Sequence, residues 1–133
     1  MDIDFDKSGG LVPAIIQDEA TGEVLMLGFM NATSYQETRR TGEVVFFSRS
    51  RNKLWKKGES SGHVLKVRDV RVDCDADALL VRVNAIGPGV CHEGYRSCFF
   101  RSLDENGVPR FVAPRTFAPE DVYQKPARSG EAK

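Results

Sequence analysis

The chain has 133 residues, of which 41% are hydrophobic and 29% charged, and its formal net charge is zero. This composition predicts one soluble domain, which we place at residues 1–118, followed by a loosely held polar tail at residues 119–133. The zero net charge excludes a general electrostatic attraction to nucleic acid or to an anionic membrane. The acidic N-terminus lacks the features of a signal peptide, and no apolar run reaches membrane-spanning length. We therefore expect a cytoplasmic protein whose three cysteines bind metal or act in catalysis.

Hydrophobic patterning predicts a chain built mainly of strands, with one helix. The first two strands flank a turn at residues 18–22 and should form a hairpin, in which Pro13 indicates an edge strand. Asn31 is a suitable N-cap for a helix that ends at about Arg40, and Gly42 is a suitable residue to follow it. The predicted strands are residues 11–17, 23–30, 43–48, 64–72, 78–86 and, at most as a short strand, 110–112.

The most polar part of the chain, residues 49–62, surrounds the only tryptophan, Trp55. Its basic side chains are Arg49, Arg51, Lys53, Lys56 and Lys57, and Ser60, Ser61 and two glycines are also present. One interpretation is a phosphate-binding loop in which basic groups and backbone N–H groups hold an anion and Trp55 offers a surface for a base. The other is a solvated loop with one buried tryptophan. The residues alone favour neither.

A short acidic segment follows the strand predicted at 64–72, and its three aspartates are Asp73, Asp75 and Asp77. If the alternation of that strand continues, Cys74 shares the apolar face with Val72 and the aspartates lie together on the opposite face, near a hairpin tip. An EF-hand is excluded because the positions that require glycine and glutamate hold Ala78 and Asn84. Three carboxylates on one face repel one another unless a positive charge neutralises them. We therefore predict a divalent, oxygen-preferring metal, with solvated aspartates as the alternative.

The three cysteines of the chain are Cys74, Cys91 and Cys98. Three thiolates would leave the fourth position of a tetrahedral Zn²⁺ open for water, as in catalytic zinc sites. His92 or His63 could instead complete a closed structural site, although adjacent residues such as Cys91 and His92 rarely aim both side chains at one ion. An open site with three thiolates is negatively charged and needs a nearby base, for which His92 and Glu93 are suitably placed. Cys98 could instead have no role in metal binding and serve only as a small apolar residue of the core.

These motifs resemble those of the phosphoribosyl-AMP cyclohydrolases, histidine-biosynthesis enzymes that open the purine ring of phosphoribosyl-AMP. The resemblance runs from about Leu11 to Leu103, and its most specific parts are Asp-Cys-Asp-Ala-Asp and Cys-His-Glu-Gly-Tyr-Arg-Ser-Cys with their spacing. Further matching segments lie at residues 22–27, 48–51 and 54–62. The resemblance implies zinc on Cys74, Cys91 and Cys98, and magnesium on Asp73, Asp75 and Asp77.

The resemblance also implies an α+β, mainly β fold: a small β-rich pseudo-barrel with a capping helix, in a homodimer whose zinc sites draw on both chains. In the implied reaction, the third step of L-histidine biosynthesis, water adds to C6 of the adenine ring and the N1–C6 bond breaks to give the formimino-carboxamide ribonucleotide. His92 is the candidate for moving the proton, and magnesium would hold a substrate phosphate or order the site. The candidate substrate contacts are Arg49, Lys53, Trp55, Lys57, Ser60 and Arg96. Glu93 stands where many members have threonine, and the absence of a following pyrophosphohydrolase domain implies the single-function form.

Two other functions fit parts of the pattern. A cytidine-deaminase-like zinc hydrolase would use Cys91 and Glu93, but that family needs Pro-Cys-x-x-Cys downstream, where this chain has only Cys98. A non-enzymatic, zinc-stabilised binding module would need a fourth protein ligand and closely spaced pairs of ligands.

Overall fold

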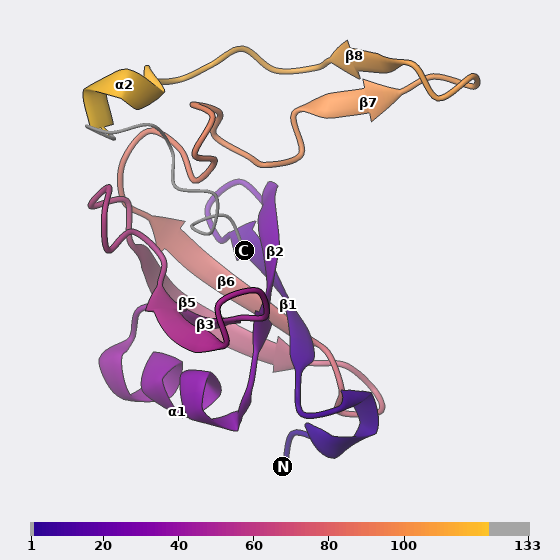
Figure 1. Cartoon of the computed structure of the whole chain (residues 1–133), viewed down its shortest axis with the longest axis vertical. Coiled ribbons are helices and arrows are strands. Elements are labelled where there is room, and N and C mark those ends of the chain that lie inside the picture. Colours follow the sequence, from indigo (N-terminus) through magenta and orange to yellow (C-terminus); the bar gives the residue numbers. More distant parts are fainter. Residues whose placement is uncertain (1, 123–133) are drawn as a thin grey trace.

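The computed structural model describes residues 2–122, which form an α+β structure made mainly of strands (Figure 1). In chain order the elements are η1 (Asp6–Ser8), β1 (Val12–Asp18), β2 (Val24–Met30), α1 (Ala32–Thr41), β3 (Val45–Ser48), β4 (Lys53–Lys56), β5 (Leu65–Val72), β6 (Leu79–Ala85), β7 (Arg101–Leu103), β8 (Pro109–Phe111) and α2 (Pro119–Val122). The largest sheet has the order β2-β1-β6-β5, in which β1 and β6 are parallel and the other neighbours antiparallel. The pairs β3–β4 and β7–β8 form two antiparallel hairpins.

The predicted hairpin of the first two strands is confirmed as β1 and β2, whose turn closes when Gly22 N–H donates to the Asp18 carbonyl at 2.8 Å. The edge position predicted from Pro13 is wrong, because β1 lies between β2 and β6. The parallel pairing with β6 begins only at Ala14, so the missing N–H of Pro13 leaves no gap in that ladder. Alternate residues of β1 are buried, and this period places Asp18 on the buried side.

Helix α1 begins and ends where the sequence predicted. Asn31 Oδ1 accepts from Ser34 N–H at 2.8 Å, and Ser34 Oγ accepts in turn from Asn31 N–H at 2.9 Å, which completes a capping box. Gly42 ends the helix in the left-handed conformation, with φ of 75°. Thr38 Oγ1 also accepts from Val45 N–H at 2.9 Å, so the helix is fastened to β3.

Strand β4 lies within the segment predicted as a polar loop, and the loop prediction is wrong for residues 53–56. The strand pairs with β3 and places Trp55 opposite Phe46, with ring centroids 5.3 Å apart. Trp55 is 9% exposed and belongs to the hydrophobic core. The sequence analysis missed this strand because two of its four residues are lysines, so the strand lacks the clear alternation of apolar and polar residues that identifies strands. One of them, Lys56, is paired with Glu43.

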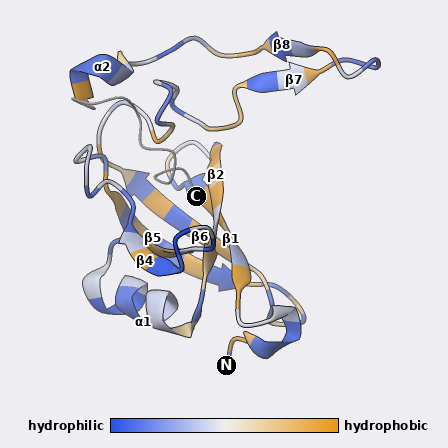
Figure 2. Cartoon of the chain, viewed as in Figure 1, coloured by the Kyte–Doolittle hydropathy of each residue, from blue (hydrophilic) through white to orange (hydrophobic). Residues whose placement is uncertain are grey.

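The core lies between the four-stranded sheet and the β3–β4 hairpin. Its fully buried members include Ile16, Leu25, Phe46, Leu65 and Val81. Hydrophobic and hydrophilic residues alternate in colour along the sheet strands in Figure 2, as expected for strands with one buried face. Gly28 allows the Phe46 ring to approach β2, because a Cβ at that position would lie 2.5 Å from the ring.

The β7–β8 hairpin extends away from the four-stranded sheet (Figure 1), and hydrophobic residues lie along it among hydrophilic ones (Figure 2). We call residues 99–112 the apolar arm; its exposed large hydrophobic residues are Phe99, Leu103, Val108, Phe111 and Val112, each between 56% and 67% exposed. Exposed apolar side chains in this number are typical of a protein interaction site.

Three sequence-based expectations concern the closure of the sheets, the C-terminal tail and membrane-spanning segments. The sheets are open in the single chain, and closure into a pseudo-barrel stays a prediction. The expected tail begins with helix α2, and its residues 123–133 lie outside the described part of the chain. Among residues 2–122 no helix is long and apolar enough to cross a membrane.

Candidate metal sites and active site

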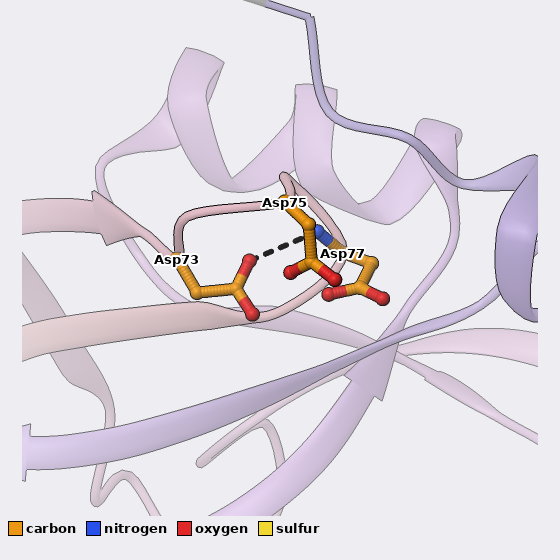
Figure 3. A group of neighbouring side chains, drawn as sticks. All are labelled: Asp73, Asp75 and Asp77. Carbon is orange, nitrogen blue, oxygen red and sulfur yellow. Dashed lines mark hydrogen bonds between the residues drawn. The ribbon is translucent and has the colours of Figure 1, made fainter.

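The turn between β5 and β6 brings the three predicted aspartates together. One oxygen from each of Asp73, Asp75 and Asp77 lies within 4.8 Å of the others (Figure 3). The turn is built by Asp73, whose Oδ1 accepts from Asp77 N–H at 3.0 Å and from Ala78 N–H at 3.2 Å. Ala76 takes a left-handed conformation with φ of 66°, which is uncommon for a residue with a Cβ. The gathering of these side chains is therefore a property of the turn, and the alternation predicted from the strand ends at Val72.

The acidic cluster formed by Asp73, Asp75 and Asp77 brings three carboxyl groups together. The carboxyl groups of Asp75 and Asp77 lie close enough to interact, and this interaction lowers the pKa of Asp75 and raises that of Asp77. Two neighbouring carboxyls behave in this way because they resist carrying two charges at close range. Carboxylate oxygens are the ligands preferred by Mg²⁺ and Ca²⁺, so the donor set fits a hard divalent cation.

Lys7 supplies a positive charge to this cluster from the N-terminal segment. Its Nζ lies 3.3 Å from Asp75 Oδ2 and 3.7 Å from Asp77 Oδ2, and it donates to the Asp75 carbonyl at 3.1 Å. The backbone of the same segment is attached to the turn, since Asp4 N–H donates to the Ala76 carbonyl at 2.7 Å. A divalent cation bound by the three aspartates would therefore compete with the Lys7 ammonium.

Cys74 lies in the same turn and is exposed, so its predicted place on the apolar face is wrong. Cys91 and Cys98 lie in the loop that follows β6, at the opposite end of that strand (Figure 1). The seven residues of β6 span roughly 20 Å at about 3.3 Å per residue. In residues 2–122 the three aspartates are the one group of three or more candidate ligands close enough to share a metal, and Cys74 does not join the other cysteines within one chain.

The cysteine loop, residues 90–98, is closed by its own backbone. Val90 N–H donates to the Arg96 carbonyl and Cys91 N–H to the Tyr95 carbonyl, both at 3.1 Å. Cys98 is fixed to the main sheet because its N–H donates to the Leu25 carbonyl at 2.7 Å. Cys91 and Cys98 pack in one small cluster with Tyr95 and Phe100, whose rings are stacked 3.7 Å apart.

The surroundings of Cys91 favour its thiolate. A hydrogen bond with the Cys98 side chain lowers the pKa of Cys91 to about 6, against the opposing effect of burial. The N–H of Glu93, which lies 3.4 Å from Cys91 Sγ, and the charge of His92 act in the same direction. Thiolates are the forms that bind Zn²⁺, so these two cysteines are suited to a soft metal ion.

The two histidines take different positions around the cysteine loop. His92 is partly exposed beside Cys91. His63 Nδ1 lies 3.0 Å from the Gly89 carbonyl, and because a carbonyl only accepts, Nδ1 must carry the proton. The ring of His63 also packs edge-on against Phe117, with centroids 5.1 Å apart.

The six candidate substrate contacts do not form one basic surface. The Arg49 guanidinium lies 4.0 Å from the centroid of the Phe29 ring, while Lys53 and Ser60 are exposed. Lys57 reaches the cysteine loop, where Nζ donates to the Val90 carbonyl at 2.6 Å. Trp55 lies in the core, so it offers no open face to a base in the single chain.

Arg96, the remaining candidate, binds two carboxylates of its own chain. Its Nη2 donates to Asp18 Oδ2 at 3.0 Å and its Nε to Glu23 Oε1 at 2.6 Å. These partners make Arg96 part of the scaffold of the cysteine loop, and its contact with a substrate phosphate stays a prediction. The sequence analysis missed the roles of Asp18, Glu23 and Lys7. Only Asp18 could have been found from the sequence, because it falls at one of the alternate positions of β1 that are buried.

We predict that Lys7→Gln tightens Mg²⁺ binding at the three aspartates. Removing the ammonium that contacts Asp75 and Asp77 should raise the Mg²⁺ affinity a few-fold, because charges at an exposed site interact weakly through water. Calorimetric titration with Mg²⁺ measures the change. Lys66→Gln is the matched control, since it makes the same charge change beside Glu43. Equal affinities for both variants and the wild-type protein would contradict the competition.

The comparisons with known proteins agree with the site. The family model of phosphoribosyl-AMP cyclohydrolase matches residues 26–100. A protein of that name from Solibacter usitatus is 57% identical over 123 residues, which cover 92% of this chain and 97% of the relative. Relatives of the same name from Nitratidesulfovibrio vulgaris (strain DP4) and Methanosarcina mazei are 52% and 50% identical; each match covers 91% of this chain, and 95% and 99% of the relative respectively. The chain belongs to the phosphoribosyl-AMP cyclohydrolase family.

Proposed function

We propose that the chain hydrolyses the adenine ring of 1-(5-phosphoribosyl)-AMP, the third step of L-histidine biosynthesis, in the cytoplasm. The observation that carries this proposal is that the family match at residues 26–100 contains all six candidate metal ligands and His92. Water adds to C6 and the N1–C6 bond breaks; one proton of the water moves to N1 as the C6 carbonyl of the carboxamide forms. The same family match argues against a deaminase and against a zinc-stabilised module without activity.

The proposed zinc ligands are Cys74, Cys91 and Cys98. The chemistry of the donors supports this assignment, because Cys91 and Cys98 are in contact and the pKa of Cys91 is lowered to about 6. Zn²⁺ bound there would act as a Lewis acid that lowers the pKa of water. The three thiols themselves hold and orient the metal, and His92, next to Cys91 in the chain, takes the proton that water loses.

The proposed magnesium ligands are Asp73, Asp75 and Asp77. Their clustered oxygens support a hard cation, and so does the mutual repulsion of Asp75 and Asp77, which lowers the pKa of one and raises that of the other. A cation there would help to hold a substrate phosphate, which the carboxylates alone would repel. Arg49, Lys53 and Ser60 remain candidates for the second phosphate, and Lys57 is a candidate for shaping the cysteine loop around the base.

We also propose that the active form is a homodimer in which Cys74 of one chain joins Cys91 and Cys98 of the other. Two observations support this arrangement. The cysteines lie at opposite ends of β6 in the single chain, and the apolar arm exposes a surface suited to a second copy. Closing the open sheets into a pseudo-barrel would then involve both chains.

The proposed activity predicts zinc-dependent turnover. The purified chain should convert phosphoribosyl-AMP into the formimino-carboxamide ribonucleotide, a strong chelator should abolish turnover, and added Zn²⁺ should restore it. Product formation is followed by chromatography and metal content by elemental analysis. Full activity in verified zinc-free protein would remove zinc from the mechanism, and no turnover by zinc-loaded protein would refute the activity.

The proton-transfer role predicts a separable effect of His92→Ala. Turnover should fall by roughly 10²–10⁴-fold, the usual contribution of a general acid–base group, while zinc content stays near that of the wild-type protein. His63→Ala is the matched control. His63 donates to the Gly89 carbonyl of the chain, so its replacement should lower turnover less than His92→Ala does. A normal kcat for His92→Ala would transfer the role to another residue.

The shared zinc site predicts complementation between inactive variants. Cys74→Ala and Cys91→Ala proteins, unfolded together and refolded with Zn²⁺, should recover about a quarter of wild-type activity, because random pairing makes half of the dimers mixed and each mixed dimer has one intact site. A mixture of Cys91→Ala and Cys98→Ala is the control and should recover nothing, since both changes fall in the half-site contributed by one loop. If mixed dimers form and the first mixture also stays inactive, each chain builds its own site.

A further inference from the structure

A buried carboxylate lies at the end of β1, outside the family's metal motifs. Asp18 is 5% exposed, and its Oδ2 accepts from Thr21 Oγ1 at 2.7 Å, from Thr21 N–H at 3.2 Å and from Arg96 Nη2 at 3.0 Å. Arg96 also donates from Nε to Glu23 Oε1 at 2.6 Å. A charge buried to this extent is stable only with such partners, so the Arg96 side chain is committed to the β1–β2 turn.

This ion pair joins the β1–β2 turn to the cysteine loop. Arg96 lies between the two loop cysteines, and its own carbonyl accepts from Val90 N–H at 3.1 Å, next to Cys91. On its other side, Ser97 Oγ donates to the Val24 carbonyl at 2.8 Å and Cys98 N–H to the Leu25 carbonyl at 2.7 Å. Arg96 therefore lies between the contacts that hold the two arms of the loop, and its side chain adds a further attachment, to the β1–β2 turn.

The geometry of the pair depends on an arginine. Its fork places two N–H donors on two different carboxylates, which sets the direction of the side chain as well as its position. A lysine would supply one charged group without that constraint. The loop is held in one shape by contacts far apart in the sequence, since Asp18 and Arg96 are separated by 78 positions.

We propose that Asp18, acting through Arg96, is a positioning residue of the zinc site. The ion pair holds the cysteine loop so that Cys91 and Cys98 are in contact before the metal binds, which reduces the cost of ordering two ligands. This inference rests on the proposed zinc site, and it assigns to the β1–β2 turn a part in metal binding although that turn supplies no ligand.

The test compares metal binding by the full-length wild-type chain with that of the double variant Asp18→Asn/Arg96→Gln. The double change removes the ion pair without leaving a buried charge unpaired. Cobalt(II) is the probe, because its absorption reports thiolate coordination as well as affinity. We expect Co²⁺ affinity to fall roughly tenfold, the lower end of what supporting residues around a metal site contribute, and the thiolate-to-cobalt absorption to change shape.

Arg82→Gln is the matched control. Arg82 also binds the end of β1, donating to Gln17 Oε1 at 3.1 Å and to the Glu19 carbonyl at 3.3 Å, but it is attached to β6 and not to the cysteine loop. It should leave the Co²⁺ affinity and spectrum unchanged. If the double variant has a lowered melting temperature but the Co²⁺ affinity and spectrum of the wild-type chain, the ion pair contributes to stability alone, and the inference is overturned.

Two further outcomes are decided by the same measurements. If the double variant does not fold, Arg96→Lys keeps a positive charge beside Asp18 but loses the fork that binds two carboxylates, and a wild-type affinity and spectrum in that variant would overturn the inference. If the wild-type chain binds neither Co²⁺ nor Zn²⁺, the proposed zinc site fails and this inference falls with it. A wild-type chain that binds metal, with variants that bind equally well, refutes the inference alone.

Discussion

Strand β6 is the constraint on which the arrangement of both candidate sites depends. It is paired on both edges, parallel with β1 and antiparallel with β5, and its alternate residues Leu79, Val81 and Val83 are buried. A one-residue slip would move these side chains to the opposite face, so the register of β6 is fixed. The carboxylate turn before β6 and the cysteine loop after it are consequently held at a constant separation.

That separation places the proposed zinc ligands of one chain at the two ends of β6, with Cys74 before the strand and Cys91 and Cys98 after it. In the proposed homodimer, a two-fold axis would bring the start of one β6 to the end of its partner and would do so twice, so that one interface would complete two sites. The apolar arm supplies exposed surface for such an interface. In the proposed homodimer, zinc binding and association stabilise each other, because the three thiolates of each site come from two chains.

The sequence predicted the main strands better than the surroundings of individual side chains. The three aspartates lie together as predicted, but the cause is the turn capped by Asp73, and Cys74 is exposed as a result. Strand β4 was missed because of its lysines. The burial of Trp55 against Phe46 and the pairing of Arg96 with Asp18 depend on contacts between distant segments, which no local pattern contains.

Ion pairs within the chain reduce the number of basic groups that are available to bind a substrate with two phosphates. Several basic groups are committed within the chain: Lys56 to Glu43, Arg96 to Asp18 and Glu23, and Lys7 to Asp75 and Asp77. A basic patch therefore contributes less than the sequence suggested. In the proposed function a divalent cation at the aspartates adds two positive charges and displaces one ammonium, which turns a repulsive cluster into a phosphate site. Phosphate binding should then depend more on that cation than on the net charge of the surface.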